Sequence, residues 1–498
     1  MSYDKIMELA SRKSLFYQAS EIYPNSPAGF WDFGPIGASI RRKIIEVWRK
    51  ELVQKEDMLE IHGAQILPKQ VYEGSGHLTD FKDPIVQCLK CKKYERADQL
   101  ITKILKKEVP EATPLEKLNE LIKNNNIKCD KCKGELSEVK HFSLMVESII
   151  GRGELKTFLR PEACQSIFLN FVRMHKTMRL KLPQGIAQVG GAFRNEISPR
   201  QSITRAIEFT QMEAEVFFNP KEINEIGNWD EIKDYELKIL RLNSKKVENI
   251  KAKELVSKKI VQGKLIAYYL ARTQQLFDKL GIPLDKMRFR EVDKDERAFY
   301  SLLTFDFEVE TSLGWLELVA NNYRTDYDIK RHQEYSKTKL EYTFEDGKKL
   351  IPYIWEISAG VDRTLYTVLE CSLKNGKEGD YLALNPIIAP YQVAIFPLVK
   401  KDQLPELAKK IDKDLKNKWT ETFYDEAASV GRRYARADEI GIPYAVTIDH
   451  QSLRDNTVTL RYRDTGKQIR IKIEDIHPTL ISLIWCQKEL SDFGKFIN

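Results

Sequence analysis

Two strand-like runs within AQVGGAFRNEISPRQSITRAIEFTQMEAEVFF, residues 187–218, constrain the fold more than any other feature of the chain. Side chains alternate between the two faces of a strand. On the first run one face carries Gln188, Gly190, Ala192, Arg194 and Glu196. On the second run Phe209, Gln211, Glu213 and Glu215 share a face, and the other face carries Thr210, Met212, Ala214 and Val216. If the runs pair as a hairpin, one face therefore combines an arginine, carboxylates and an aromatic ring, which indicates a binding site.

A simpler interpretation is an amphipathic hairpin with a solvated outer face, which is common in antiparallel sheets. Two features favour a site. The connecting loop is far longer than the usual hairpin loop of about two to five residues. The first run is also rich in glycine, which lets a ligand approach the backbone closely.

The chain has 498 residues, of which 42% are hydrophobic and 10% aromatic, so we expect about two to four globular domains. We find no signal-peptide core and no run of about eighteen apolar residues, so we expect a soluble, cytoplasmic protein. The net charge is +7 with 31% charged residues. This mild basic excess permits a polyanionic partner without requiring one.

Four of the cysteines form two C-x-x-C pairs, Cys88 with Cys91 and Cys129 with Cys132. Two such pairs fit a tetrahedral zinc site. Two redox pairs or disulfides are the alternative, which a reducing cytosol disfavours. The long separation of the pairs indicates a subdomain inserted between them.

Several further segments have clear periodicity. Residues 36–57 place apolar side chains on one helical stripe, and a short extended run after them ends at Pro68. FDFEVETSLGWLELVA and PYIWEISAG are predicted strands, and the second leads into the predicted helix VDRTLYTVLECSLK. Arg363 lies in the first turn of that helix, where the free backbone N–H groups favour an anion.

Two other regions differ in pattern from the rest. Residues 221–290 are rich in lysine and helical in pattern, so we expect a helical appendage there. From about 385–390 onward, short strands alternate with helices, which indicates a separate α/β domain.

The charged side chains suggest a ligand. Arg194 and Arg363 can each bind a phosphate with two parallel hydrogen bonds. Glu196 and Glu208 can accept hydrogen bonds from an amino group, and Phe209 offers a ring for stacking. Together these groups fit a nucleoside triphosphate on an antiparallel sheet, and the sequence contains no Walker-type glycine loop.

The order of these features resembles the three motifs of class II aminoacyl-tRNA synthetases: a long helix with a proline-ended strand, F-R-x-E with a loop leading to R-x-x-x-F, and a glycine-containing strand that enters a helix bearing an arginine. SGHLTDFKDP, LRPE, FRNEISPR, EFTQME, GWLEL, RTDYDIKRHQEYS and GRRYARADEIGIPYAVTID are similar to segments of the homodimeric glycyl-tRNA synthetases. The resemblance extends over about 16–476.

The resemblance implies an α+β fold: a class II antiparallel catalytic sheet with helices, an inserted zinc-binding subdomain and a C-terminal α/β anticodon-binding domain. The expected boundaries are 1–84, 142–220 and 291–385 for the catalytic domain, 85–141 for the zinc-binding insertion, 221–290 for a helical insertion facing the acceptor stem, and 386–498 for the anticodon-binding domain.

The resemblance also implies roles in binding ATP. Arg194 would bind the α-phosphate, Glu196 the adenine amino group, Arg205 the outer phosphates and Arg363 the γ-phosphate, while Phe209 would stack on adenine. Glu317 would bind Mg²⁺. The expected nucleotide and magnesium site is completed by Asn195, Thr204, Glu208, Leu318 and Gly360.

For the amino acid, the resemblance implies that Glu162, Glu213 and Glu356 surround the ammonium of glycine, with Ser358 close to the α-carbon. Arg96 is a further expected contact. Rejecting a larger amino acid by lack of space needs no editing domain. Three carboxylates repel one another unless a cation lies between them.

The chain departs from the family in places. RPEACQS stands where the family has R-P-E-T-A-Q-G, and VANNYRTDYD stands where it has a G-I-A-D-R segment. Arg324 keeps the family's arginine, for which a contact with the adenylate is implied. Asp362 before Arg363 matches the bacterial and archaeal form of the third motif.

The expected partners are tRNA(Gly), glycine and a second copy of the chain, without a membrane. GRRYARAD combines arginines and a tyrosine, which suits RNA contact, and a solvated helix face is the alternative. Two alternatives for the function stay open: a catalytically silent synthetase-like RNA-binding protein, and a class II synthetase for proline or threonine.

Overall fold

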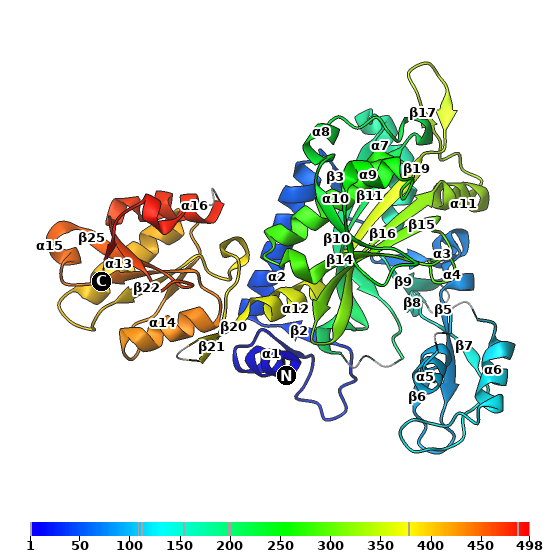
Figure 1. Cartoon of the computed structure of the whole chain (residues 1–498), viewed down its shortest axis with the longest axis horizontal. Helices are drawn as coiled ribbons and strands as arrows, with labels where there is room; N and C mark the ends of the chain where they lie inside the picture. Colours follow the sequence, from blue (N-terminus) through cyan, green and yellow to red (C-terminus); the bar gives the residue numbers. More distant parts are fainter. Residues whose placement is uncertain are drawn as a thin grey trace.

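The structure is a computed structural model that describes residues 2–107, 109–110, 113–152, 155–197, 199, 201–376, 379–485 and 488–497. Figure 1 shows a large lobe built on one wide sheet, a small subdomain below it and a separate C-terminal lobe. Within these ranges, no helix combines the length and apolarity needed to cross a lipid bilayer.

The large lobe contains a nine-stranded sheet. Its strands, in spatial order, are β13 (Glu248–Lys251), β12 (Glu236–Leu240), β14 (Met287–Glu291), β15 (Leu303–Thr311), β16 (Gly314–Thr325), β19 (Tyr353–Gly360), β11 (Glu208–Phe218), β10 (Gln184–Phe193) and β3 (Leu59–Ile61). All neighbours from β14 to β10 are antiparallel. The predicted antiparallel sheet of an α+β fold is confirmed.

Helices cover one face of this sheet (Figure 1). They are α2 (Pro35–Trp48), which continues as a π-helical segment at Arg49–Gln54, α10 (Lys264–Lys279) and α12 (Val361–Ser372). Met212, Ala214 and Val216 of β11 lie fully buried in the same core as Ile40 and Ile44 of α2. The alternation in the sequence therefore separated the core face of β11 from its polar face.

Other helices surround the polar side of the lobe. They are α3 (Lys69–Ser75), α4 (His77–Asp80), α7 (Gln165–Met178) and α11 (Tyr327–Ser336). A small sheet of β4 (Ile66–Pro68), β9 (Leu155–Leu159) and β8 (Val146–Ile150) lies next to them. The remaining elements of the lobe are α1 (Ser2–Arg12), β1 (Phe16–Gln18), β2 (Trp31–Phe33), β17 (Tyr342–Thr343), β18 (Lys349–Leu350), β20 (Leu373–Gly376) and β21 (Gly379–Leu382).

The prediction that 221–290 is a helical insertion is only partly right. The segment contains α8 (Trp229–Ile232), α9 (Ala252–Ser257) and α10, but it also supplies β12, β13 and β14 to the main sheet. ELKIL in β12 buries alternate side chains, as a strand with one covered face does. The lysine-rich composition masks the strand pattern of such short segments in the sequence. Their conformation depends on pairing within the folded sheet.

The cysteine-bearing insertion folds around β5 (Lys82–Gln87), β6 (Tyr94–Arg96), β7 (Lys140–Ser143), α5 (Ala97–Leu105) and α6 (Leu115–Asn124). It has an apolar core of its own, which includes Val86, Leu100, Ile101 and Leu118. A separate core allows this insertion to fold as a subdomain.

The C-terminal lobe contains a six-stranded sheet in the order β23 (Thr422–Tyr424), β22 (Val393–Pro397), β24 (Tyr444–Ile448), β25 (Thr457–Tyr462), β26 (Gln468–Lys472) and β27 (Phe496–Ile497). Its helices are α13 (Leu404–Asn417), α14 (Val430–Glu439), α15 (Ser452–Asp455) and α16 (Ile476–Trp485). β22 runs parallel to both of its neighbours, and the later pairs are antiparallel. The predicted α/β domain is confirmed.

The arginines of GRRYARAD have mostly structural contacts. Arg433 is 2% exposed and donates to the backbone carbonyls of Pro397 and Leu398. Arg436 is paired with Asp425, and Arg432 is exposed. Of the three arginines of this motif, Arg432 is therefore the exposed one.

Candidate active site

The hairpin of β10 and β11 forms as the alternation predicts. Gln188 lies opposite Glu213, Gly190 opposite Gln211, and Ala192 opposite Phe209. Directly opposed residues point to the same face of an antiparallel pair. The polar side chains of both strands therefore lie on one face.

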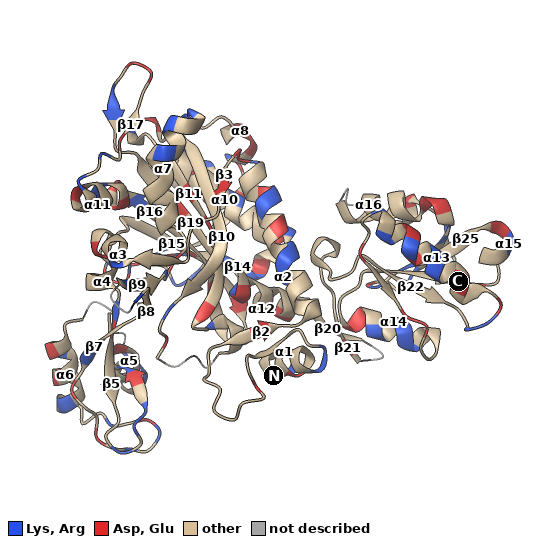
Figure 2. Cartoon of the chain, turned by 180° about the vertical axis from the view of Figure 1, so that it is seen from behind, with Lys and Arg blue, Asp and Glu red and all other residues tan. Residues whose placement is uncertain are grey.

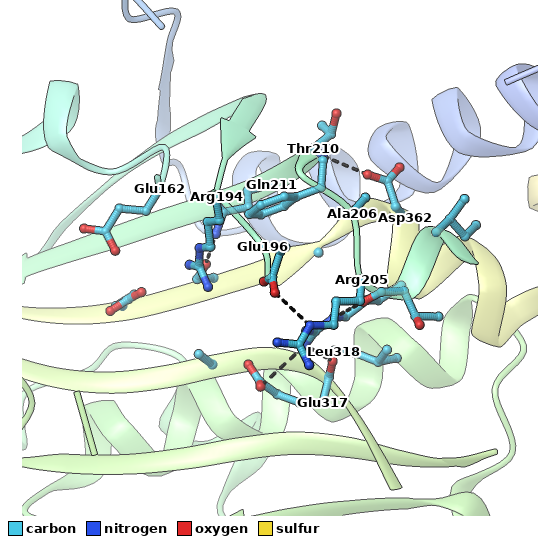
Figure 3. Close-up of a pocket in the computed structure, with 18 of the residues that line it drawn as sticks. Glu162, Arg194, Glu196, Arg205, Ala206, Thr210, Gln211, Glu317, Leu318 and Asp362 are labelled. Atoms are coloured by element: carbon cyan, nitrogen blue, oxygen red, sulfur yellow. Dashed lines mark hydrogen bonds and ion pairs between the residues drawn. The ribbon is translucent and has the colours of Figure 1, made fainter. Parts of the chain in front are cut away.

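A pocket lies on this face, between β11, β16, β19 and the loop that joins β10 to β11 (Figure 3). Its lining includes most of the predicted site residues, namely Glu162, Arg194, Glu196, Thr204, Arg205, Phe209, Glu317, Leu318, Glu356, Ser358, Gly360 and Arg363. The arginines and glutamates that the sequence places far apart therefore meet in one cavity.

Arg194 lies beside the aromatic rings at one part of the pocket. Its guanidinium carbon is 5.4 Å from the ring centroids of both Phe209 and Phe81. Its Nε donates a 3.1 Å hydrogen bond to the carbonyl of Pro161. One edge of the guanidinium is thus held by the protein, which sets its direction before a ligand binds.

Arg205 and Glu196 point toward each other across the pocket (Figure 3). Arg205 Nε donates a 2.8 Å hydrogen bond to Glu196 Oε2. The Arg205 side chain is 30% exposed, so the pair lies partly in solvent. Exposed pairs of this kind are weak, at about 0–1 kcal/mol, so a ligand can separate these two side chains at little cost.

Arg363 lies in the first turn of α12, which directly follows β19. Its Nε donates to the carbonyl of Thr204 at 3.0 Å, and its Nη1 donates to the carbonyl of Glu317 at 3.0 Å. The Glu317 carboxylate oxygen Oε2 is 3.5 Å from the same nitrogen. The guanidinium thus bridges the loop before β11 to strand β16, and both partners belong to the predicted nucleotide site.

The acidic residues lie along β11, β19 and the loop after β9. Ser358 donates to Glu213 Oε1 at 2.8 Å. Glu356 Oε2 accepts from Arg324 Nη1 at 2.8 Å and from Asn322 Nδ2 at 3.1 Å. Glu162 Oε1 accepts from Gln165 Nε2 at 2.9 Å and lies 3.1 Å from His77 Nε2.

These glutamates are not equivalent electrostatically. Burial, together with the charges of Glu162 and Glu356, raises the pKa of Glu213 to about 8. Burial also raises the pKa of Glu356, although Arg324 opposes this. For Glu162 burial again favours the protonated form, but His77 and Arg324 outweigh it and hold the pKa well below its ordinary value. The free pocket therefore keeps Glu162 ionised and Glu213 protonated at neutral pH, and a substrate cation would reverse the state of Glu213.

Arg324 is paired with buried carboxylates, one of which lines the pocket. It is fully buried, it donates two hydrogen bonds to Asp328 at 2.7 and 2.8 Å, and its guanidinium carbon is 3.6 Å from the ring centroid of Tyr300. A guanidinium held by Asp328 and Glu356 is a positioning group for the acidic residues. The expected contact of Arg324 with the adenylate stays a prediction.

Four predicted site residues are not part of the lining of this pocket. One of them, Glu213, is fully buried beside Ser358, which does line it. The Glu208 side chain is exposed at the start of β11, and Asn195 donates its backbone N–H to the carbonyl of Leu144. Arg96 lies in the insertion, where it is paired with Asp98 and Asp83 and lines a second cavity together with Arg205. Their roles stay predictions.

The structure adds residues that sequence reasoning did not assign to the site. Glu215 is fully buried next to Glu356 in the strand register, and burial raises the pKa of its carboxyl well above the ordinary value. Gln211 lines the pocket and donates to Ser358 at 3.2 Å. The alternation in EFTQMEAE already placed both side chains on the site face, so this signal could have identified them.

The four cysteines of the two C-x-x-C pairs come together in the insertion. Their sulfur atoms all lie within 4.8 Å of one another. Cys88 Sγ is 3.5 Å from Cys132 Sγ, and Cys91 Sγ is 3.7 Å from Cys129 Sγ. Thiolates about 2.3 Å from a tetrahedral zinc ion lie about 3.8 Å apart, whereas a disulfide is about 2.05 Å long. The geometry therefore fits a structural zinc site and not disulfides.

Comparison with known protein families supports this description. Residues 148–372 match the family described as "tRNA synthetase class II core domain (G, H, P, S and T)", and residues 392–483 match the family described as "Anticodon binding domain". The antiparallel sheet, its arginine-lined pocket and the C-terminal domain therefore define a class II aminoacyl-tRNA synthetase.

Full-length relatives identify the family within this class of synthetases. The chain is 37% identical to the glycine--tRNA ligase of Pyrococcus furiosus over 97% of this chain and 99% of the relative. It is 38% identical to that of Pyrococcus abyssi over 97% and 98%, and 36% identical to that of Methanocaldococcus jannaschii over 95% and 97%. The chain belongs to the glycine--tRNA ligase family.

Proposed function

We propose that this protein attaches glycine to tRNA(Gly) in two steps, through a glycyl-adenylate. The observation that carries the proposal is the meeting of two unlike sets of side chains in one pocket. Arg194, Arg205 and Arg363 offer sites for a triphosphate, and Glu162 and Glu356 offer sites for an ammonium group. Membership of the glycine--tRNA ligase family supports the same function.

In the first step, a carboxylate oxygen of glycine attacks the α-phosphorus of ATP. The bond between the α-phosphorus and the bridging oxygen breaks, and pyrophosphate leaves with its electron pair. Arg194 would stabilise the negative charge on the α-phosphate oxygens as this charge develops. Its hydrogen bond to Pro161 holds the guanidinium in place, so little reorientation is needed during the reaction.

The base and the outer phosphates of ATP would take other groups. Phe209 would stack on adenine, and Glu196 would accept a hydrogen bond from the adenine amino group. Because Arg205 holds Glu196 in the free pocket, ATP binding would release Arg205 toward the outer phosphates. Arg363 would bind the γ-phosphate from the start of α12.

Glycine would be recognised by its ammonium and by its size. Glu162 and Glu356 would accept hydrogen bonds from the ammonium, and Glu213 would lose its proton when this cation arrives. Ser358 lines the pocket from β19 and donates to Glu213, so we place its side chain near the α-carbon. Protein atoms at this position would leave no room for the methyl group of alanine.

The proposed function includes two bound metal ions. Mg²⁺ would be bound by Glu317, whose carboxylate lines the pocket close to Arg363, and it would supply positive charge for the pyrophosphate leaving group. A carboxylate oxygen suits this hard cation. Zn²⁺ would be bound by Cys88, Cys91, Cys129 and Cys132 and would stabilise the inserted subdomain.

The macromolecular partners follow from the family. The C-terminal domain would bind the anticodon of the tRNA, and lysine and arginine residues occur along α13 and α14 of this domain (Figure 2). We propose a homodimer and a cytoplasmic enzyme. The residues 221–290 would lie toward the acceptor stem, although part of this segment belongs to the main sheet.

The deciding experiment is ATP–pyrophosphate exchange with each amino acid in turn. We expect exchange with glycine and little with alanine, proline or threonine. Exchange that is supported by proline or threonine and not by glycine would identify a synthetase of another specificity. Absence of exchange with every amino acid, while tRNA still binds, would identify a catalytically silent RNA-binding protein.

A further inference from the structure

Arg41 of α2 forms hydrogen bonds with two residues that line the pocket. Its Nε donates a 2.7 Å hydrogen bond to Asp362 Oδ1, and its Nη2 donates to the hydroxyl of Thr210. The other carboxylate oxygen of Asp362 accepts the backbone N–H of Thr210 at 2.8 Å, the bond drawn in Figure 3. The three residues form a closed ring of hydrogen bonds that links α2, β11 and α12.

Two members of this ring, Thr210 and Asp362, are next to residues of the proposed ATP site. Thr210 follows Phe209 on β11, and Asp362 precedes Arg363 on α12. Thr210 and Asp362 themselves line the pocket. The ring of hydrogen bonds therefore fixes the distance between Phe209, which would stack on adenine, and Arg363, which would bind the γ-phosphate.

The ring depends on Arg41 electrostatically. Asp362 is 3% exposed, and a buried carboxylate that loses its cationic partner is strongly destabilised. The Arg41 guanidinium is held from its other side by Phe33, whose ring centroid is 4.4 Å away. Arg41 is thus fixed by an aromatic ring and in turn fixes the carboxylate.

We propose that Arg41 is a positioning residue for ATP, which acts on Phe209 and Arg363 through Asp362 and Thr210. This inference rests on the proposed function, because it assumes that the pocket binds ATP. Among the hydrogen bonds of the described residues, Arg41 makes none to Glu162, Glu213, Glu356 or Ser358. Glu356 and Glu213 are held instead by Arg324, Asn322 and Ser358. Loss of the Arg41 side chain should therefore weaken the binding of ATP and leave the binding of glycine unchanged.

The next residue supplies a matched control. Arg42 lies on the same helix, but it is paired with Glu421 of the C-terminal lobe at 2.6 Å, and its side chain is 61% exposed. Arg41 and Arg42 have the same charge and the same backbone environment. Their side chains point in different directions. Comparing variants of Arg41 with variants of Arg42 therefore separates the proposed positioning role from a general effect on the stability of α2.

The experiment measures glycine-dependent ATP–pyrophosphate exchange for Arg41→Gln, Arg41→Lys and Arg42→Gln. We expect Arg41→Gln to raise the KM for ATP about 10- to 100-fold, since small displacements of binding groups have effects of this size. The KM for glycine should stay within about twofold of the wild-type value, because the residues that would bind glycine are not displaced. Arg41→Lys should have an intermediate effect, because an ammonium can pair with Asp362 but cannot also reproduce the planar fork toward Thr210. Arg42→Gln should match the wild type.

A double variant tests whether Arg41 acts through Asp362. We expect Arg41→Gln combined with Asp362→Asn to raise the KM for ATP no more than the larger single effect, because both changes open the same ring. Additive effects would overturn the proposal. Equal rises in both KM values, or equal effects of Arg41→Gln and Arg42→Gln, would also overturn it. If Arg41→Gln does not fold, Arg41→Lys gives the same comparison.

Failure of the proposed function would look different. A wild-type protein without glycine-dependent exchange would contradict that function. Calorimetric titration with a non-hydrolysable ATP analogue would then still compare Arg41→Gln with Arg42→Gln, and equal affinities would overturn the positioning role.

Discussion

Ser358 on β19 and Glu213 on β11 are register partners in the central sheet, and the Ser358 hydroxyl donates a 2.8 Å hydrogen bond to the Glu213 carboxylate. Glu213 is fully buried, and its pKa is about 8 because of burial and the neighbouring Glu162 and Glu356. This pair gives the proposed glycine site a pH dependence that can be measured.

Glycine should bind more tightly as the pH rises toward 8. Below this pH Glu213 is protonated in the free protein, and the ammonium of glycine favours its ionised form, so binding must release a proton. The Kd for glycine should fall up to about tenfold per pH unit below 8 and level off above it. Calorimetry in two buffers with different ionisation enthalpies measures both the Kd and the released proton.

Glu213→Gln serves as the control for this titration. It should bind glycine more weakly and remove most of the pH dependence between pH 6 and 8. A wild-type Kd that is constant over this range would show that Glu213 is already ionised in the free protein.

Removing the buried cation Arg324 should destabilise the whole catalytic lobe. Arg324→Met leaves the carboxylates of Asp328 and Glu356 without their partner, and we expect a loss of about 3–5 kcal/mol in the free energy of unfolding. Denaturant titration followed by circular dichroism measures it. Arg454→Met changes an exposed arginine and should alter the free energy by less than about 0.5 kcal/mol. Similar values for the two variants would contradict the structural role of Arg324.

Arg194→Gln should slow adenylate formation without weakening glycine binding. Loss of one donor to a charge that develops in the transition state costs about 10²- to 10³-fold in rate. The rate is followed by pyrophosphate exchange at saturating substrates, and the glycine Kd by calorimetry. Arg173→Gln, on the exposed side of α7, should leave both unchanged. A normal exchange rate for Arg194→Gln would remove Arg194 from the proposed reaction.

The purified protein should contain about one zinc ion per chain at the four cysteines. Metal analysis by mass spectrometry measures it. Cys129→Ser should lose the metal and make the inserted subdomain sensitive to proteolysis, since zinc binding contributes to the folding free energy. Cys371→Ala, in α12, should keep it. Wild-type protein that is free of zinc in the presence of reductant would exclude the site.

The proposed homodimer predicts a sedimentation coefficient for a particle of twice the 58.0 kDa chain mass. A closed dimer with one shared interface should keep this value across micromolar concentrations. Sedimentation velocity at several concentrations measures it, and a 58.0 kDa species throughout would contradict the dimer.

Much of the fold could be predicted because some patterns depend only on local geometry. The period of two in 187–218 separates the core face of β11 from its site face whatever the strand packs against, and the spacing of the cysteines brings two pairs of ligands together. The strands within 221–290 could not be predicted in this way. They are short, their composition is rich in lysine, and their conformation depends on pairing with the edge of a sheet built from distant segments.

The candidate site was likewise predictable from the sequence only in part. Motif order placed Arg194, Phe209, Glu356 and Arg363 in one region, and the structure brings them into one pocket. Motif order did not indicate that Arg96 pairs with Asp83 and Asp98, or that Arg324 pairs with Asp328 and Glu356. Side-chain direction after packing decided both positions.

By itself, the sequence determined the class of fold, the faces of the central strands and the residue types of the site, because backbone periodicity and ligand chemistry are local properties. Only the tertiary structure decided which charges neutralise one another. Arg41 and Asp362 are 321 positions apart and meet because α2 and α12 pack on the same face of the sheet. Glu213 acquires its raised pKa in the same way, since burial and neighbouring carboxylates exist only after the chain has folded.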